Sequence, residues 1–278
     1  MPYLSLTSWS LHRNLGPLRW TRWDETARTT YTETQDQPEL LTLLELPAIL
    51  ADKGFTSVEI CHFHFPDTSA GYLQALKQSF QKAGIRFYTL LIEYGDISSA
   101  DAGRREADLA WIEGWIDIAA NAGAERVRVI AGDANPADQE ALERSANGLS
   151  ELGQYAAARG VKVVTENFHA LTSEADNCLA LLERCGETIG FTSDFGNFKG
   201  EGKYKALART IPRSESIHAK AQTDAGGIPD EDEFIRCMDL VKQAGYEGPI
   251  TLVYDGPGDM WEGIERVRKL AAPYFTVK

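Results

Sequence analysis

The chain has 278 residues, of which 43% are hydrophobic and 25% are charged, the ordinary composition of a globular protein. Its net charge of -13 at pH 7 disfavours non-specific binding to the phosphate backbone of nucleic acids. The cysteines form no CxxC pair, so neither a zinc knuckle nor a disulfide framework is indicated. No stretch reaches 18 apolar residues and the chain opens without a basic segment, so we expect no membrane partner and a cytoplasmic location.

A helical stretch, a glycine and then a short β-rich run recur along the chain. The glycines of this pattern are Gly54, Gly84, Gly123, Gly160, Gly186 and Gly245. A helix commonly ends at a left-handed residue, a conformation that glycine adopts without a Cβ clash. The Val-, Ile-, Phe- and Thr-rich runs that follow suit strands buried on both faces.

The opening run YLSLTSW and the run ESIHAKA, which has no glycine of its own, complete a set of eight strands that alternate with eight helices. Eight β-α units predict an α/β fold of the (β/α)8 TIM barrel class, as a single domain over residues 1–278. A doubly wound open sheet is the alternative. It is disfavoured because no GxGxxG follows the first strand.

The connection after the first strand, residues 13–42, is long for a loop between a strand and a helix. It carries Trp20, Trp23 and Tyr31 among many polar residues. In a barrel this connection lies at the C-terminal ends of the strands, where active sites are built. We therefore expect it either to cover a ligand or to serve as an ordered decoration or oligomer contact.

Polar side chains gather where the predicted strands end, which is the position of catalytic residues in a barrel. In chain order, these residues are Glu59, His62, His64, Glu93, Arg128, Asp133, Glu166, Asn167, His169, Asp194, Asn197, His218, Lys220 and Asp255.

Glu166, Asp194 and His218 lie at the ends of three successive predicted strands. Neighbouring strands are ~5 Å apart, so these three side chains can converge on one ion. Two carboxylates and one imidazole suit Mn²⁺, Mg²⁺, Co²⁺ or Zn²⁺, and no thiolate narrows the choice. Each residue alone has a simpler explanation as a helix cap or a hydrogen-bonded histidine, but their coincidence predicts a divalent-metal site.

The motifs TENFH, SDFGNF and SIHAKA, preceded by VEICHFHFP, LLIEYGD and RVRVIAG, resemble the sugar phosphate isomerase/epimerase family of xylose-isomerase-like TIM barrels. The resemblance extends over nearly the whole chain. It implies a metal held by Glu166, Asp194 and His218, with a further glutamate from the last strand. It also implies residues that line the substrate site: His62, Arg128, Asn197 and Lys220.

The last strand, ITLVYDG, departs from this family pattern. The family's glutamate ligand falls on Val253, whereas Asp255 lies ~6.6 Å further along the same face of the strand, at ~3.3 Å per residue. We therefore expect a three-residue metal site, with Asp255 as a substrate contact. Ligation by Asp255, directly or through water, is the alternative.

The expected reaction is the isomerisation or epimerisation of a sugar or sugar derivative by proton transfer through an enediolate. A bound metal would acidify the carbon between a carbonyl and a hydroxyl, Glu166 would act as the base, and Lys220 would stabilise the enediolate. Loss of one flanking carboxylate harms a two-base epimerisation more than a one-base isomerisation or dehydration. The expected partner is a small sugar, and family habit suggests a homodimer.

Three alternatives have different consequences. A metal-dependent dehydratase or lyase would act on a related keto-sugar or cyclic ketone with the same first step. A carbohydrate-binding barrel without turnover would have lost catalysis together with the carboxylate at Val253. An endonuclease-IV-like nuclease is disfavoured, because five histidines are few for a three-metal site and the acidic charge opposes DNA.

Overall fold

The computed structural model describes residues 1–275, so residues 276–278 of the predicted domain lie outside the described residues. Eight parallel strands close into a barrel, which confirms the predicted fold class. Around the barrel the order is β1-β10-β9-β8-β7-β6-β5-β4. The strands are β1 (Tyr3–Thr7), β4 (Ser57–Cys61), β5 (Arg86–Leu91), β6 (Arg126–Arg128), β7 (Lys162–Glu166), β8 (Ile189–Asp194), β9 (Ser216–Lys220) and β10 (Pro249–Val253).

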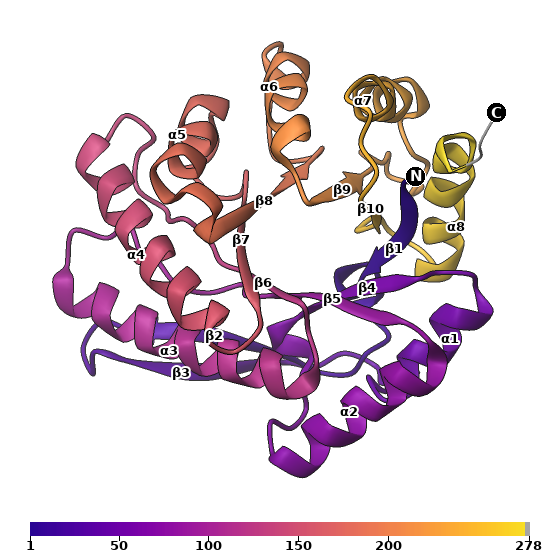
Figure 1. Cartoon of the computed structure of the whole chain (residues 1–278). Helices are drawn as coiled ribbons and strands as arrows, with labels where there is room; N and C mark the ends of the chain where they lie inside the picture. The colour runs from indigo at the N-terminus through magenta and orange to yellow at the C-terminus, as the bar shows by residue number, and fades with distance from the viewer. Residues whose placement is uncertain (276–278) are drawn as a thin grey trace.

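Helices surround the barrel, as Figure 1 shows. They are α1 (Leu46–Asp52), α2 (Ala70–Ala83), α3 (Ala102–Ala122), α4 (Gln139–Ala157), α5 (Ala175–Cys185), α6 (Lys203–Thr210), α7 (Glu231–Gln243) and α8 (Met260–Ala271). Short 3-10 turns are η1 (Ser8–Leu11), η2 (His62–His64), η3 (Gly186–Thr188), η4 (Ile211–Arg213) and η5 (Ala272–Tyr274). Within residues 1–275, no helix combines the length and apolar character needed to cross a bilayer.

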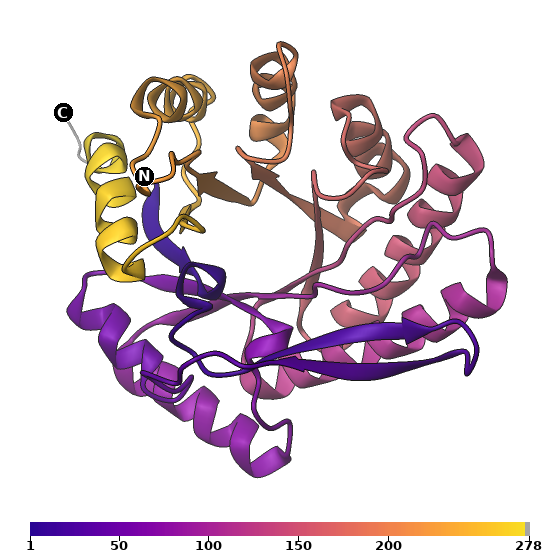
Figure 2. The ribbon, with the colours of Figure 1, turned by 180° about the vertical axis from the view of Figure 1, so that it is seen from behind.

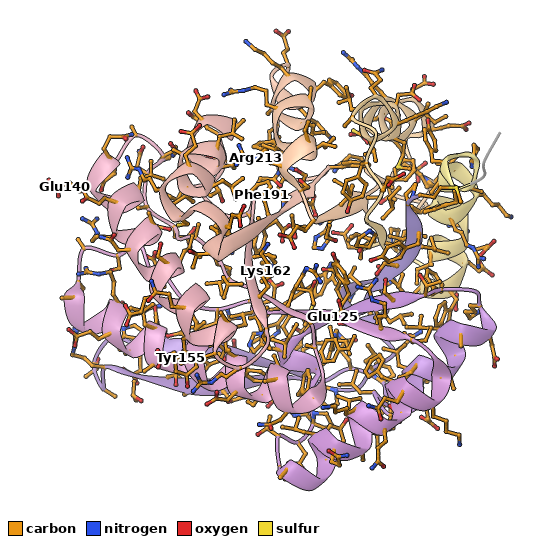
Figure 3. All side chains as sticks on the ribbon, in the orientation of Figure 1. Glu125, Glu140, Tyr155, Lys162, Phe191 and Arg213 are labelled. Atoms are coloured by element: carbon orange, nitrogen blue, oxygen red, sulfur yellow. The ribbon has the colours of Figure 1, made fainter. Side chains whose placement is uncertain are left out.

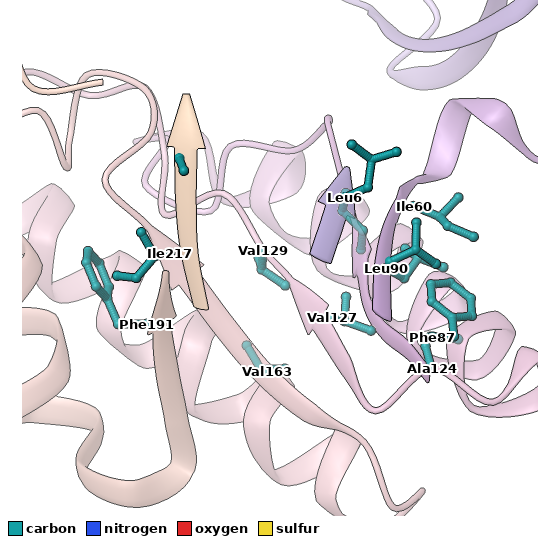
Figure 4. Packing of buried hydrophobic residues seen from close by; sticks show 14 of the residues in the cluster. Leu6, Ile60, Phe87, Leu90, Ala124, Val127, Val129, Val163, Phe191 and Ile217 are labelled. Carbon is teal, nitrogen blue, oxygen red and sulfur yellow. The ribbon is translucent and has the colours of Figure 1, made fainter. Parts of the chain in front are cut away.

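The apolar core lies between the strands and the helices. Leu6, Ile60, Val127, Val163 and Ile217 lie on the outer face of their strands and belong to one buried cluster that includes helix side chains (Figure 4). The other face of each strand points into the barrel because side chains alternate with period two. That interior is polar and buried, with Ser5, Ser57, Glu59, Thr192, Ser216 and Thr251.

Ion pairs close the N-terminal end of the barrel. Arg86 Nη2 lies 2.6 Å from Glu125 Oε2, and Arg126 Nε lies 3.0 Å from Glu215 Oε2. Lys162 also pairs with Glu215; Glu125 and Lys162 are labelled in Figure 3. In this fold, charged networks at the N-terminal end contribute to stability, whereas chemistry is carried out at the opposite end.

The long connection after β1 folds as a hairpin of β2 (Leu18–Asp24) and β3 (Thr29–Gln35), outside the barrel sheet (Figure 2). Its tip binds α3, where Arg28 Nη2 lies 2.9 Å from Asp101 Oδ1. Nearer its base, the Trp20 ring packs on Phe63 with 4.3 Å between centroids. The hairpin therefore brings aromatic residues to the C-terminal ends of the barrel strands.

Candidate active site

A cavity of about 380 Å³ lies at the C-terminal ends of the strands. Its walls are Thr7, Trp9, Trp20, Arg22, Cys61, Phe63, Leu91, Glu93, Arg128, Glu166, Phe168, His169, Asp194, Asn197, His218, Lys220, Val253 and Asp255. A larger and more open hollow of about 660 Å³ lies around Glu125 and Arg159, but the described residues that line it include none of the predicted site residues. The predicted site residues therefore gather at the smaller cavity.

Glu166, Asp194 and His218 converge in this cavity. They come from three neighbouring strands, and one ligand atom from each lies within 4.8 Å of the others. His218 Nδ1 is 3.4 Å from Glu166 Oε1 and 3.6 Å from Asp194 Oδ2. Among residues 1–275, this is the one group of three such side chains placed to hold a metal ion.

Glu59, on β4, holds the imidazole from inside the barrel. Its Oε2 atom lies 2.9 Å from His218 Nε2, and its Oε1 atom accepts from Ser216 Oγ at 2.5 Å and Thr251 Oγ1 at 2.9 Å. Burial raises the pKa of Glu59, but His218 and these hydroxyls outweigh burial and lower it. A buried carboxylate that fixes the far nitrogen of a histidine is the usual support of a metal ligand.

The donor atoms fit a divalent cation. Burial lowers the pKa of His218, yet the carboxylates of Glu166 and Glu59 outweigh burial and raise it well above the usual value. Glu166 Oε2 is buried and, within the described chain, has no aligned hydrogen-bond partner, although Arg128 Nε is 3.1 Å away. Two carboxylates and an imidazole, which gives up a proton when it binds an ion, suit Mg²⁺, Mn²⁺, Co²⁺ or Zn²⁺.

Arg128 and Asn197 hold the Glu166 carboxylate in place. Arg128, buried on β6, donates to the Ile92 carbonyl at 2.8 Å and pairs with Glu93. Burial lowers the pKa of Arg128, but Glu93 and Glu166 raise it, so the guanidinium stays charged. Asn197 Nδ2 donates to Glu166 Oε1 at 3.1 Å. Arg128 and Asn197, two of the predicted substrate contacts, therefore line the cavity and also position the candidate base.

Lys220 and Asp255 form an ion pair on the wall beside Val253. Lys220 Nζ lies 2.6 Å from Asp255 Oδ2, and Lys220 is opposite Val253 in the register of β9 and β10. Burial lowers the pKa of Lys220, but Asp194 and Asp255 raise it. Gly196 provides the space, because a Cβ there would be 2.8 Å from Lys220 Cδ. The Asp255 carboxylate thus contacts an ammonium group and is not part of the Glu166–Asp194–His218 cluster.

His62 lies behind the cavity wall. Its ring packs edge-on against Trp111 and Trp115, with centroids 5.3 and 5.2 Å away, and its Nδ1 atom accepts from the Glu93 N–H at 3.1 Å. Burial lowers the pKa of His62 to about 3. The described lining residues do not include it, so the structure does not bring His62 together with the other predicted site residues.

Several wall residues were not among the predicted site residues. Trp9, Trp20, Phe63 and Phe168 give the cavity an aromatic side, and His169 lies beside them. The aromatic content of residues 13–42 was the signal for Trp20, but nothing in the sequence gives the direction of its ring. In the sequence, His169 is one of the polar residues at the end of a predicted strand, and no function was assigned to it.

The chain matches the xylose isomerase-like TIM barrel family over residues 47–270. It belongs to this family. The match confirms the resemblance carried by the strand-end motifs. Within the curated proteins, the chain is 26% identical over 250 residues to a protein of Streptomyces coelicolor named "Putative hydroxypyruvate isomerase", with coverage of 79% of this chain and 87% of the relative.

The solved structures with a similar fold include proteins that are named for different activities. The probable 3-DHS dehydratase AsbF of Bacillus anthracis gives a TM-score of 0.69 at 15% identity, covering 98% of this chain and 99% of the other. An L-ribulose 3-epimerase gives 0.67 at 17% identity, covering 99% of each chain. A xylose isomerase-like protein of Mycobacterium smegmatis, in complex with magnesium, gives 0.62 at 17% identity, covering 82% and 87%. These likenesses establish a shared fold.

Proposed function

We propose that the protein is a divalent-metal-dependent isomerase or epimerase of a sugar or sugar derivative. The observation that carries this proposal is the Glu166–Asp194–His218 cluster, with His218 held by the buried Glu59. The isomerase and epimerase activities named for a relative and for structures of the same fold support it. A relative of the same fold in complex with magnesium supports a metal at the cluster.

In this proposal, Glu166, Asp194 and His218 hold the metal. When bound, it polarises a carbonyl and the neighbouring hydroxyl and acidifies the carbon–hydrogen bond between them. Glu166, kept in position by Arg128 and Asn197, removes that proton and returns it, so that the reaction proceeds through an enediolate.

The remaining walls would position the substrate. Lys220, held by Asp255, donates hydrogen bonds to a substrate oxygen on which negative charge develops. Trp9, Trp20 and Phe63 offer apolar faces to the carbon–hydrogen face of a sugar. Val253 supplies no carboxylate opposite Glu166, which favours one-base isomerisation over two-base epimerisation.

Solvent-deuterium incorporation tests the proposal. The purified protein, loaded in turn with Mg²⁺, Mn²⁺, Co²⁺ and Zn²⁺, is incubated in D₂O with hydroxypyruvate, L-ribulose or D-psicose, and products are followed by NMR. We expect deuterium at the carbon next to the carbonyl, with a product isomer. Glu166→Gln should lower the rate roughly 10²–10⁴-fold. Glu140→Gln is the control, because Glu140 is 91% exposed at the edge of the molecule (Figure 3).

Other outcomes select the alternatives. Loss of water from a keto-sugar or cyclic ketone, without an isomeric product, would replace the proposal by a dehydratase. Sugar binding without deuterium incorporation under any metal would replace it by a carbohydrate-binding barrel. The homodimer and the cytoplasmic location stay predictions, which light scattering and cell fractionation would check.

A further inference from the structure

His169 has a strained backbone on the wall of the cavity. Its φ is 68°, and among residues 1–275 the only other non-glycine residue with positive φ is Arg28, in the turn of the hairpin. Left-handed backbone costs energy in a residue with a Cβ, and such strain gathers at functional sites. His169 follows the end of β7 by a few residues. Its side chain is part of the wall of the cavity that Glu166 also lines.

Asp133 fixes the orientation of this ring. His169 Nδ1 lies 2.9 Å from Oδ1 of Asp133, which is in the loop between β6 and α4. The Leu171 N–H donates to the Gly132 carbonyl at 3.2 Å and joins the two loops. Because a carboxylate only accepts, Nδ1 carries the hydrogen and Nε2 is the atom left for a ligand. The described residues provide no hydrogen-bond partner for Nε2, and the side chain is 34% exposed.

His169 and Asp133 are both partly exposed, and His169 is also part of the cavity wall. A cavity-lining ring that a carboxylate orients matches the geometry of catalytic histidines. The last strand has Val253 where the family has a carboxylate. In the described cavity wall, that position therefore offers no carboxylate that could transfer a proton in place of His169.

We propose that His169 moves the proton between the two oxygens of the substrate while Glu166 moves the proton between the two carbons. This inference rests on the proposed function. Glu166 first takes the C–H proton, which gives an enediolate with its charge on the former carbonyl oxygen. Neutral His169 Nε2 then accepts the proton of the neighbouring hydroxyl and passes it to that charged oxygen. The second oxygen becomes the carbonyl as Glu166 returns its proton to the other carbon. Both side chains end as they began.

His169→Asn is the informative variant. Asparagine is well tolerated in left-handed backbone, and its amide can donate to Asp133 in place of Nδ1, so the loop should keep its conformation. It cannot transfer a proton through Nε2. Arg28→Asn is the matched control, because it places the same residue at the other left-handed position, at the tip of the hairpin.

The experiment compares wild type, His169→Asn and Arg28→Asn, loaded with Mn²⁺, in the conversion of hydroxypyruvate in D₂O. We expect His169→Asn to lose roughly 10²-fold in product formation, with unchanged metal content and melting temperature, and to be partly rescued by added imidazole. Arg28→Asn should stay within about twofold. Product formation by His169→Asn within about threefold of wild type would overturn the inference.

A second readout separates this inference from the proposed function. Ring-nitrogen NMR of His169 is recorded with and without hydroxypyruvate. If wild type incorporates deuterium into none of hydroxypyruvate, L-ribulose and D-psicose with any of the four metals, the proposed function fails. A shift of the Nε2 signal on addition of hydroxypyruvate would then still support contact between His169 and ligand, whereas an unshifted signal would overturn the inference as well.

Discussion

The imidazole of His218 is held from two sides, by carboxylates at the cavity and by Glu59 within the barrel. Glu59 contributes no atom to the candidate metal cluster. Its effect is to keep His218 Nε2 occupied, so that Nδ1 points to Glu166 and Asp194. The orientation of the one nitrogen ligand therefore depends on a residue that reaches it across the barrel interior from β4.

Replacement of Glu59 by glutamine should weaken metal binding. The amide keeps the size of the side chain but removes the charge that orients and polarises His218, and loss of such a partner lowers metal affinity about 10–100-fold. Competition with a chromogenic chelator measures the affinity, and Ser216→Ala, which removes one hydrogen bond to Glu59, is the milder comparison. Equal affinities in wild type and Glu59→Gln would contradict this role.

Replacement of Val253 by glutamate should strengthen metal binding. Val253 is buried on the cavity wall next to Lys220, so a glutamate there would add a carboxylate on the side of the site that lacks one. We expect about a tenfold gain in affinity, ~1.4 kcal/mol. Val253→Gln is the matched control, with the same length and no charge. A gain of the same size in both variants would show that charge is not the cause.

The sequence could predict the three candidate ligands because consecutive parallel strands are neighbours in a barrel. It could not predict the contact between Glu59 and His218, since these residues come from β4 and β9 and meet only across the closed interior. It also could not place His62. Glu59 points into the barrel, so the period-two alternation puts Cys61 and Phe63, which both line the cavity, on the inner face and His62 on the outer one.

At the scale of elements, the hairpin β2–β3 is the main departure from a plain barrel. Its alternation brings Trp20 and Arg22 to the cavity, while Trp23 points to α3, where Arg104 Cζ lies 4.6 Å from the ring centroid. The sequence showed that residues 13–42 are too long for a simple loop. It did not show a hairpin, because the residues at its turn, Glu25 to Arg28, include no glycine to mark it.

Replacement of Trp20 by alanine should weaken sugar binding without affecting the metal. The ring lines the cavity and packs on Phe63, and an aromatic contact is worth ~0.5–1.5 kcal/mol, so KM should rise roughly 2–10-fold. Trp23→Ala, on the same strand but against α3, is the matched control. A similar rise of KM in both variants would mean that the whole hairpin, and not the Trp20 ring, is responsible.

At the scale of the molecule, the two ends of the barrel differ in how their charged side chains are paired. The N-terminal end is closed by compensated ion pairs, whereas the C-terminal end concentrates buried carboxylates around His218. The alternation of strands and helices predicted this fold because each β-α unit is short and regular. The polar interior was not predictable, since the same period-two pattern does not say which face turns inward.

Metal binding should therefore stabilise the whole chain. An ion that binds only the folded state adds about 2.7 kcal/mol at a free concentration of 100 times Kd. For a chain of this size the melting temperature should rise by roughly 5–10 °C. Calorimetry of the protein with Mn²⁺ and with excess chelator measures the difference. Melting temperatures that do not depend on metal would contradict a metal site at the centre of the barrel.

Metal content of matched variants is the most direct test of a three-ligand centre. Wild type, Asp194→Ala and Asp255→Ala are dialysed against chelator, reloaded with Mn²⁺ and measured by elemental analysis. We predict about one ion per chain in wild type and in Asp255→Ala, because Asp255 is paired with Lys220, and loss of the ion in Asp194→Ala. Loss of the ion in Asp255→Ala as well, or no ion in wild type, would contradict the account.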